Sequence, residues 1–408
     1  MLKKKFINRG ILFLCAALMI TACTEKYEVD LNDTYEDLLV VEAIITNENK
    51  QHEITLSKTA ALGSDDSTEY VSTAEVYITS DSGDNYTFSY NAGSTKYISD
   101  IAFLPVADVN YTLHIDYNGD TFTSTDVQMA PVAEMTGLTI ERKEVSGTDG
   151  IQISLSTNSP DSKLLRYTYE ETFKIIAPKW SDKKASFYYE YHWPPADPTP
   201  SFEWTYREGE SRTCYRTQYS ENIILNQFDD TQQSDNINDM QIRFIPNDSY
   251  IMSYRYCIKT KQFVHNATAF SFYKGLKNTS SSNSTLSPIQ PGFVKGNITN
   301  ETNSSQKVIG IFDVATVTES ERTFFNYEDY YPNEDLPPYY SDCDEIELDG
   351  TEFDRESGEI DGYVLLSYIE QGSHVLYKVE GDIYTMVPAA CGDCTTLGSN
   401  VAPEFWVD

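Results

Sequence analysis

The sequence predicts a mainly β protein, in which an immunoglobulin- or transthyretin-like β-sandwich precedes a larger β-rich domain with one conspicuous α-helix. Three observations support this prediction. The chain of 408 residues contains 30 Tyr and 19 Phe, which favour strands. Short segments of alternating apolar and polar residues recur between turn sequences, and a single segment stands out for its helical periodicity. At about 150 residues per domain, the length indicates two or three domains.

The charge balance narrows the range of partners. Asp and Glu number 63 whereas Lys and Arg number 30, which gives a formal net charge of −33 at pH 7. Phosphate backbones and anionic lipid surfaces attract basic proteins. The composition therefore argues against nucleic acid and against electrostatic binding to an anionic membrane.

The first 22 residues have the organisation of a lipoprotein signal peptide. Basic residues from Lys3 to Arg9 precede an apolar run, residues 11–20, that is too short to cross about 30 Å of hydrocarbon. Residues 20–23 (ITAC) have the pattern of a lipobox, in which a small residue precedes a cysteine that is acylated, for example with palmitate. We therefore expect cleavage after residue 22 and a lipid anchor on Cys23. The alternative is an ordinary secretory peptide whose cysteine is unmodified.

Residues 23–37 are polar and acidic, and we expect them to form a tether. Acidic residues directly after an acylated cysteine resemble the export signal that sends Bacteroidota lipoproteins to the outer surface. We therefore expect the folded part to face outward from the bacterial outer membrane. A plain soluble linker, on a protein that faces the periplasm, is the alternative.

Residues 38–130 have the pattern of a small β-sandwich. Apolar residues alternate with polar residues in several short segments, and turn sequences such as residues 81–84 (DSGD) and 118–119 (NG) separate some of them. Six or seven strands at this spacing are typical of such a sandwich. The expected strands lie within residues 39–45, 53–56, 74–79, 86–90, 111–117 and 121–123.

Pro131 and the polar stretch 141–150 mark the start of the second domain, which extends from residue 131 to residue 408. One helix is expected over residues 266–277, because Asn266 can cap its start, apolar residues share one face and lysines lie late in the segment. Alternation predicts strands elsewhere. These lie within residues 151–155, 165–169, 221–225, 241–245, 250–259, 307–317, 361–369 and 374–386.

Five cysteines remain when the signal peptide and Cys23 are set aside. An oxidising envelope favours disulfides, and five thiols allow at most two bridges and one free cysteine. The residues 391–394 (CGDC) are alternatively a redox pair, although no helix N-terminus is expected beside them, or part of a metal site with Cys343. The disulfide candidates are Cys214, Cys257, Cys343, Cys391 and Cys394.

No local motif for catalysis stands out. The histidines do not form an H-E-x-x-H motif, and nucleophile-elbow, P-loop and dinucleotide-binding motifs lack a convincing context. We therefore predict a protein without enzymatic activity. A hydrolase that uses scattered Asp or Glu residues is the alternative, because glycosidase carboxylates have no local signature.

Residues 180–206 form an aromatic insertion with several prolines in its second half. Because proline restricts ladder pairing, one interpretation is a long hairpin or loop with exposed rings, which are suited to glycans, peptides or proteins. The other interpretation is that the rings cover the core of the second domain. The candidate ligand-binding aromatics are Trp180, Tyr191, Trp193 and Trp204.

Residues 326–361 carry 14 acidic residues and a single basic one, Arg355. We expect a solvated acidic loop. The alternative is a Ca²⁺ site that includes Asp342, Asp344 and Glu347, although their spacing does not match an EF-hand loop. No other cofactor is expected.

The end of the chain carries a specific resemblance. Residues 391–406 (CGDCTTLGSNVAPEFW) resemble the close of the Bacteroidota lipoproteins called domain of unknown function 4249. The similarity covers nearly the whole mature chain. It includes Cys23, residues 39–47, residues 270–276, residues 296–300 and residues 308–312.

This resemblance implies an outer-membrane lipoprotein whose gene accompanies that of a TonB-dependent receptor, in a family without an established biochemical activity. We therefore expect a non-enzymatic surface lipoprotein that helps a TonB-dependent transporter capture or admit a nutrient. That receptor would be its partner, and a glycan or peptide its ligand. A structural or adhesin-like envelope module is the first alternative, and the carboxylate-dependent hydrolase is the second.

Overall fold

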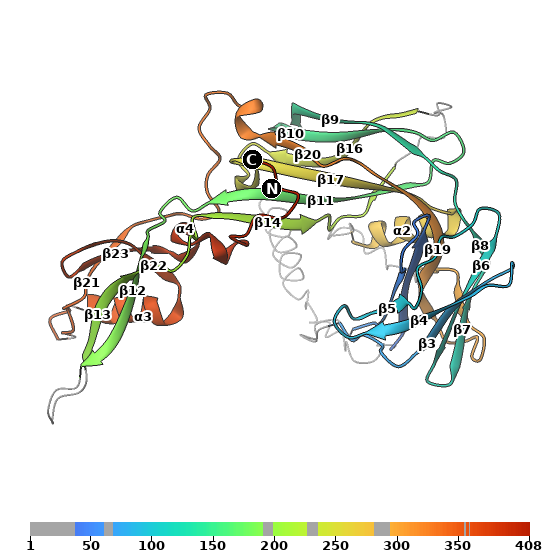
Figure 1. Ribbon diagram of the computed structural model, residues 1–408, viewed down its shortest axis with the longest axis horizontal. Coiled ribbons are helices and arrows are strands. Elements are labelled where there is room, and N and C mark those ends of the chain that lie inside the picture. The colour runs from blue at the N-terminus through green and yellow to red at the C-terminus, as the bar shows by residue number, and fades with distance from the viewer. Residues whose placement is uncertain are drawn as a thin grey trace, which may run out of the picture.

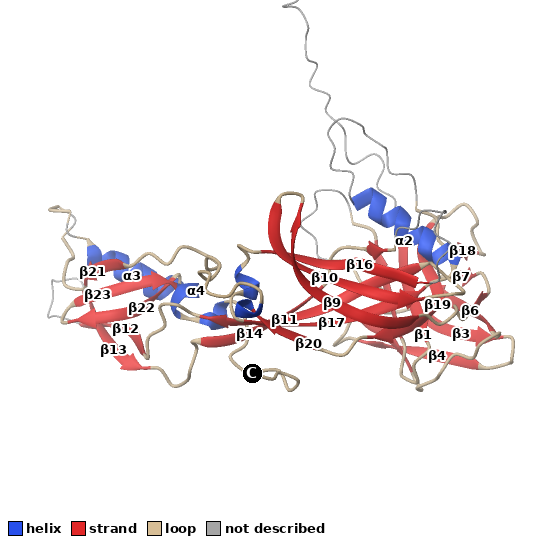
Figure 2. Ribbon diagram, turned by 90° about the horizontal axis from the view of Figure 1, so that it is seen from above, coloured by secondary structure: helices blue, strands red, loops and turns tan. Residues whose placement is uncertain are grey.

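The computed structural model describes residues 37–60, 68–190, 199–226, 236–280, 294–354, 356–358 and 360–408. The chain is mainly β, as the sequence predicts, and it forms three units along an elongated molecule (Figure 1). Two β-sandwich units lie next to each other, and a smaller lobe with two helices lies at the opposite end (Figure 2). Within the described residues, one sheet of fifteen strands runs through both sandwich units.

The first unit is a sandwich-like sheet that curls around one core, in the order β19-β1-β2-β5-β4-β3-β6-β7-β18. Alternate residues of β1 and β6 are buried and their neighbours are more exposed, which is the alternation expected of a strand with one face on a core. The strands are β1 (Leu39–Thr46), β2 (Glu53–Lys58), β3 (Glu75–Ser80), β4 (Asn85–Asn91), β5 (Lys96–Ser99), β6 (Asn110–Tyr117), β7 (Asp120–Ser124), β8 (Val127–Gln128), β18 (Ile298–Asn300) and β19 (Val308–Glu319).

Strand β19 joins the two sandwich units. Residues 308–315 of this strand pair in parallel with β1, whereas residues 316–319 pair with β17 (Arg255–Val264). The large sheet therefore continues across the boundary expected near residue 131. Val308, Phe312 and Val314 belong to the core of the first unit although they come much later in the chain.

The second unit packs the sheet β16-β10-β9 over the strands at the other end of the large sheet. Ile151 and Ile153 of β10 share one buried core with Phe173 of β11 and Tyr256 of β17. The strands are β9 (Glu134–Val145), β10 (Thr148–Asn158), β11 (Leu165–Ile176), β14 (Thr213–Tyr219), β15 (Ile224–Leu225), β16 (Asn236–Pro246) and β20 (Thr323–Asn326), with short 3-10 turns η1 (Tyr250–Met252) and η2 (Tyr327–Asp329).

The expected helix over residues 266–277 is present as α2 (Ala267–Ser280). Ala269 and Phe272 pack on Ile311 of β19, so the helix covers one face of the large sheet. The side-chain amide of Asn266, the residue before the helix, donates to Asp313 Oδ1 at 2.7 Å and to a backbone carbonyl of β8 at 2.9 Å. Among the described residues, no helix is long and apolar enough to cross a bilayer.

The small lobe combines a hairpin, a three-stranded sheet and a helix around their own core. Its elements are β12 (Lys183–Glu190), β13 (Thr199–Tyr206), β21 (Ile346–Asp349), α3 (Asp361–Gln371), β22 (His374–Glu380) and β23 (Ile383–Pro388), followed by α4 (Ala389–Gly392) and η3 (Cys394–Thr396).

Three strand predictions in the second domain are wrong in detail. Residues 361–369 form the helix α3, in which Leu365 is buried and the half-buried Tyr368 and Ile369 lie about one turn further on. Residues 374–386 form two strands instead of one, because Gly381 has φ +61° and turns the chain between β22 and β23. The segment 250–259 begins as the turn η1, and β17 starts at residue 255.

Candidate functional site

The aromatic insertion forms the hairpin β12–β13, which lies on the small lobe (Figure 1). The register pairs Ala185 with Trp204 and Phe187 with Phe202, so these side chains share one face of the hairpin. Ala185 and Phe202 pack against the core of the small lobe, where the Phe202 ring centroid lies 5.9 Å from that of Tyr384. This part of the hairpin therefore covers a core, as one interpretation of the sequence expected.

Other rings of the hairpin are exposed, as the other interpretation expected. Tyr189, Trp204 and Tyr206 are 41%, 40% and 64% exposed, and the register places all three on the face that also carries Phe202. We call these three residues the aromatic surface. Tyr188 is 47% exposed but lies on the opposite face of the hairpin. Exposed apolar groups that gather on one face are a common feature of interaction sites.

Trp204 contacts a second aromatic ring and an ammonium group. The ring of Tyr206 meets that of Trp204 edge-on, with centroids 5.7 Å apart, and Lys183 Nζ lies 4.0 Å from the Trp204 centroid. The ammonium group therefore supplies a hydrogen-bond donor next to the rings. Sequence reasoning missed Lys183, although its position opposite Tyr206 follows from the hairpin register.

Of the four aromatic residues that the sequence suggested for ligand binding, Trp204 lies on the aromatic surface. Trp180 lies before the hairpin, half-buried against the core of the second unit, and its indole nitrogen lies 3.3 Å from Ser211 Oγ. Tyr191 and Trp193 lie outside the described residues.

Two disulfides connect the segments around the small lobe. Cys214 bonds Cys394 across 180 residues, Cys343 bonds Cys391 across 48 residues, and Cys257 is free and buried. The five cysteines therefore form the two bridges and leave the one free thiol that the sequence allowed at most. Since Cys391 and Cys394 bond different partners, they do not form a redox pair with each other, and neither is available as a metal ligand. Burial raises the pKa of the Cys257 thiol, which makes it a poor nucleophile.

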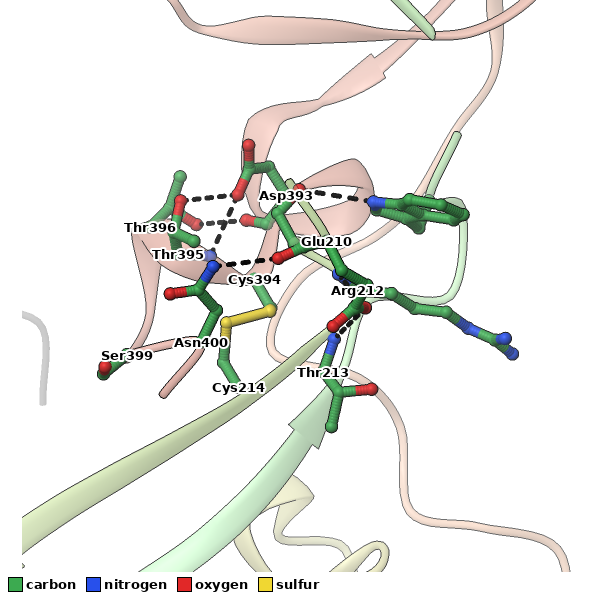
Figure 3. The surroundings of a disulfide bond; sticks show 12 residues. Glu210, Arg212, Thr213, Cys214, Asp393, Cys394, Thr395, Thr396, Ser399 and Asn400 are labelled. Carbon is green, nitrogen blue, oxygen red and sulfur yellow. Dashed lines mark hydrogen bonds between the residues drawn. A yellow bond between two sulfur atoms is a disulfide. The ribbon is translucent and has the colours of Figure 1, made fainter. Parts of the chain in front are cut away.

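The Cys214–Cys394 bridge is surrounded by hydrogen bonds that attach the end of the chain to the second unit (Figure 3). The Asn400 side-chain amide donates to the Glu210 backbone carbonyl at 2.9 Å. The Glu210 carboxylate accepts the backbone N–H groups of Arg212 and Thr213. A Cβ on Gly398 would lie 2.5 Å from the carbonyl oxygen of Tyr215, so a glycine is required where the two backbones approach.

Asp393 connects this segment to the hairpin. Its carboxylate accepts Thr395 N at the start of η3, and Arg207, the residue after β13, donates to its Oδ2 at 2.6 Å. Burial alone would raise the pKa of Asp393, but the hydrogen bonds from Thr395 and Arg207 outweigh it and lower the pKa. The carboxylate therefore stays charged, and the hairpin is held at its base by an ion pair.

A family profile described as Domain of unknown function (DUF4249) matches residues 24–321, which is well over half of the chain. The chain belongs to this family. Neither the search of curated proteins nor the search of solved structures found a match.

In this DUF4249 protein, the matched range contains both sandwich units almost completely and also the hairpin β12–β13. The rest of the small lobe and the motif at residues 391–406 follow the matched range. The aromatic surface is therefore contributed by a part of the chain that the family profile covers.

The acidic segment offers no metal centre in the part of the chain that the structure describes. No group of three or more His, Cys, Asp or Glu residues that could hold an ion was found there. Asp342, Asp344 and Glu347 lie before and in β21 without forming such a group. Part of the segment is ion-paired instead, since Glu345 contacts Lys179 at 2.6 Å and Lys378 at 3.5 Å.

Proposed function

We propose that this DUF4249 protein is a lipid-anchored accessory of a TonB-dependent transporter in the bacterial outer membrane. In this proposal it captures a glycan or peptide nutrient with the aromatic surface. The observation that carries the proposal is a set of exposed rings on a hairpin whose base is held by an ion pair and a disulfide-bonded segment.

The arrangement of the units supports a role in contact with a ligand. The described chain begins beside β1 in the first unit, whereas the hairpin β12–β13 lies at the opposite end of the molecule (Figure 2). A lipid on Cys23 would hold the first unit near the bilayer, because the segment from Cys23 to Asp37 reaches at most ~50 Å when fully extended. The aromatic surface would then be presented away from the anchor.

Tethering also explains how modest affinity would suffice. An anchored protein and a transporter in the same membrane meet at a high effective concentration. Aromatic rings on a rigid hairpin lose little rotamer entropy when they bind. Capture therefore requires neither a deep cavity nor a catalytic group.

We predict that Trp204→Ala and Tyr206→Ala each weaken ligand capture at least tenfold without unfolding the protein, because both rings are partly in water. The measurements are binding to glycan and peptide arrays and nutrient-dependent growth of the producing cells. Tyr219→Ala is the matched control, since Tyr219 is 68% exposed but lies on β14 of the second unit. Equal effects of Tyr219→Ala and Trp204→Ala would contradict the proposal.

The partner and the anchor have their own test. Mature protein purified from detergent-solubilised membranes should carry fatty acid on Cys23 and should bring a β-barrel receptor with it. Repeated absence of such a receptor, together with normal uptake after gene deletion, would favour a structural or adhesin-like role. Turnover of a glycan or peptide by the purified protein would favour the hydrolase.

A further inference from the structure

A second, separate site lies where the two sandwich units meet. A hollow of about 420 Å³ opens on the face of the large sheet that also carries α2. Residues of the first unit form one wall, and Arg166 of β11 and Phe263 of β17 form the other. The volume is within the usual range for a small-molecule site, roughly 300–1,000 Å³.

Arg166 is fixed in place by three side chains. Its Nε donates to His265 Nε2 at 2.9 Å, and its guanidinium carbon lies 4.5 Å and 4.4 Å from the ring centroids of Phe263 and Tyr273. Two aromatic rings and one hydrogen bond leave the guanidinium little freedom to move. The group is therefore pre-organised before any ligand arrives.

His265 is in turn held by a buried carboxylate. Its Nδ1 lies 2.8 Å from Asp313 Oδ2, and the two side chains are 0% and 1% exposed. Burial lowers the pKa of His265 in spite of the contact with Asp313, so the ring is neutral at pH 7. Nδ1 then carries the proton for Asp313, and Nε2 is free to accept from Arg166.

The outer edge of this guanidinium has no partner in the part of the chain that the structure describes. Among the described residues, neither terminal nitrogen of Arg166 forms a hydrogen bond or an ion pair. The other two cations of the hollow differ, because Lys50 contacts Glu48 at 2.5 Å and Lys96 contacts Glu53 at 2.6 Å. An unpaired arginine is unexpected in a chain with 63 acidic and 30 basic residues.

We propose that this hollow binds the carboxylate of a small organic molecule or of a peptide C-terminus, with the terminal nitrogens of Arg166 as a two-pronged donor. The planar guanidinium matches a carboxylate or a phosphate. A single negative charge is favoured here, because Glu42, which has no ion-pair partner among the described residues, also lines the hollow and repels a doubly charged phosphate more strongly than a carboxylate. The site requires neither the aromatic surface nor the lipid anchor.

The first experiment measures binding to the full mature chain by calorimetry with four probes. Ala-Ala-Ala and hexanoate each carry one carboxylate, the C-terminal amide of Ala-Ala-Ala carries none, and inorganic phosphate is the competing anion. Binding of Ala-Ala-Ala or hexanoate without binding of the amide supports the proposal. Tighter binding of Ala-Ala-Ala indicates a peptide C-terminus as the ligand, and tighter binding of hexanoate indicates a small organic acid. Binding of phosphate alone, or of none of the four, overturns the proposal.

The second experiment assigns the binding to Arg166. Arg166→Gln should lower the affinity for the carboxylate probe at least tenfold, and Arg166→Lys should retain part of this affinity. Lys96→Gln is the matched control in the same hollow and should change affinity less than threefold, because Lys96 is already paired. Equal losses in Arg166→Gln and Lys96→Gln would overturn the assignment.

A third variant guards against a folding defect in Arg166→Gln. Thr55 of β2 is half-buried in the wall of the hollow. Thr55→Trp should fill the hollow and abolish binding while Arg166 and His265 stay intact. Unchanged binding by folded Thr55→Trp would place the probe elsewhere and overturn the proposal.

Discussion

Glu171 shows at the scale of one residue how this acidic chain buries a carboxylate. Its side chain is 2% exposed and accepts from Arg243 Nε at 3.0 Å, from Gln218 Nε2 at 2.5 Å and from the Tyr256 hydroxyl. Burying a charge is costly unless it is paired and hydrogen-bonded. Burial and the neighbouring Glu171 raise the pKa of Tyr256 well above its usual range, so the hydroxyl remains a donor.

The partners of Glu171 lie 47 to 85 residues away in sequence. No local sequence pattern predicts such a cluster, because each of these residues occupies a position on its own strand where a polar side chain is common. The same applies to Arg166 and Asp313, which His265 joins. The sequence predicted the state of the cysteines better, because the count alone limits five thiols to two bridges and one free residue.

His52 makes stability depend on pH. It is 1% exposed, its Nε2 donates to the Phe103 carbonyl at 3.1 Å, and its Nδ1 has no partner among the described residues. Burial lowers its pKa from 6.5 to about 4, and the charges nearby are Lys50 and Glu48. Between these two values the unfolded chain binds a proton that the folded chain does not bind. The free energy of unfolding therefore falls as the pH is lowered through this window.

Between pH 6.5 and pH 4, His52 should cost the unmodified protein roughly 2–3 kcal/mol of unfolding free energy. His52→Gln should not show this fall, because its amide can still donate a hydrogen bond but does not titrate. Urea unfolding at several pH values measures the effect. His114→Gln is the control, since His114 lies on the less buried face of β6. An unchanged pH dependence in His52→Gln would contradict the prediction.

At the scale of the element, helix α3 shows why composition misled the strand prediction. Residues 361–369 contain Val, Ile and two Tyr, which favour strands. The helix forms because Leu365 and its neighbours one turn away pack on β21 and β22, and because Gly372 with φ +63° provides a left-handed C-terminal cap. Gly372 was the feature of the sequence that could have indicated a helix here, because glycine often follows the end of a helix. A hairpin or loop was one of the two interpretations of the aromatic insertion, and the ladder of β12–β13 tolerates Pro200 because it is only the second residue of β13.

The Cys214–Cys394 bridge fixes the elements around the small lobe. We expect the double variant Cys214→Ser, Cys394→Ser to lose about 4–5 kcal/mol of unfolding free energy, because the bridge closes a loop of 180 residues. Hydrogen exchange should accelerate in η3 and at the start of β14. Exchange in β1 and β6 should not change, since they belong to a different core.

Cys257→Ala is the matched control for this bridge. It also removes a buried cysteine, but one that forms no disulfide. Its effect should be the small cost of one cavity, about 1 kcal/mol. Faster exchange in η3 in this variant, equal to that of the double variant, would show that the bridge is not what holds the segment.

At the scale of the whole molecule, the order of the strands in the sheet differs from their order in the sequence. β1 lies beside β19, and their paired residues are separated by most of the chain. Parallel neighbours need a crossover connection, and here the crossover contains the other strands of the first unit, most of the second unit and the hairpin. Sequence periodicity could predict both strands but not this pairing, which depends on the distant apolar residues of β19 completing the first core.

The last prediction tests this dependence on β19. A fragment of residues 37–130 contains every strand of the expected N-terminal sandwich but lacks Ile298, Val308, Phe312 and Val314. At about 1.5–3 kcal/mol for each buried side chain, the missing contacts amount to about 6–12 kcal/mol, as much as a typical domain's entire stability. One edge of β1 would also be left unpaired.

We therefore expect residues 37–130 to remain unfolded or to aggregate, with poorly dispersed amide signals in NMR spectra. Residues 294–319 joined to this fragment by a flexible linker should restore a folded spectrum, because β18 and β19 can then complete the core. The same linker followed by residues 294–319 with Phe312→Asp and Val314→Asp is the control and should fail. A well-folded 37–130 fragment would contradict the prediction, and the first unit would then fold as an independent domain on which β19 docks later.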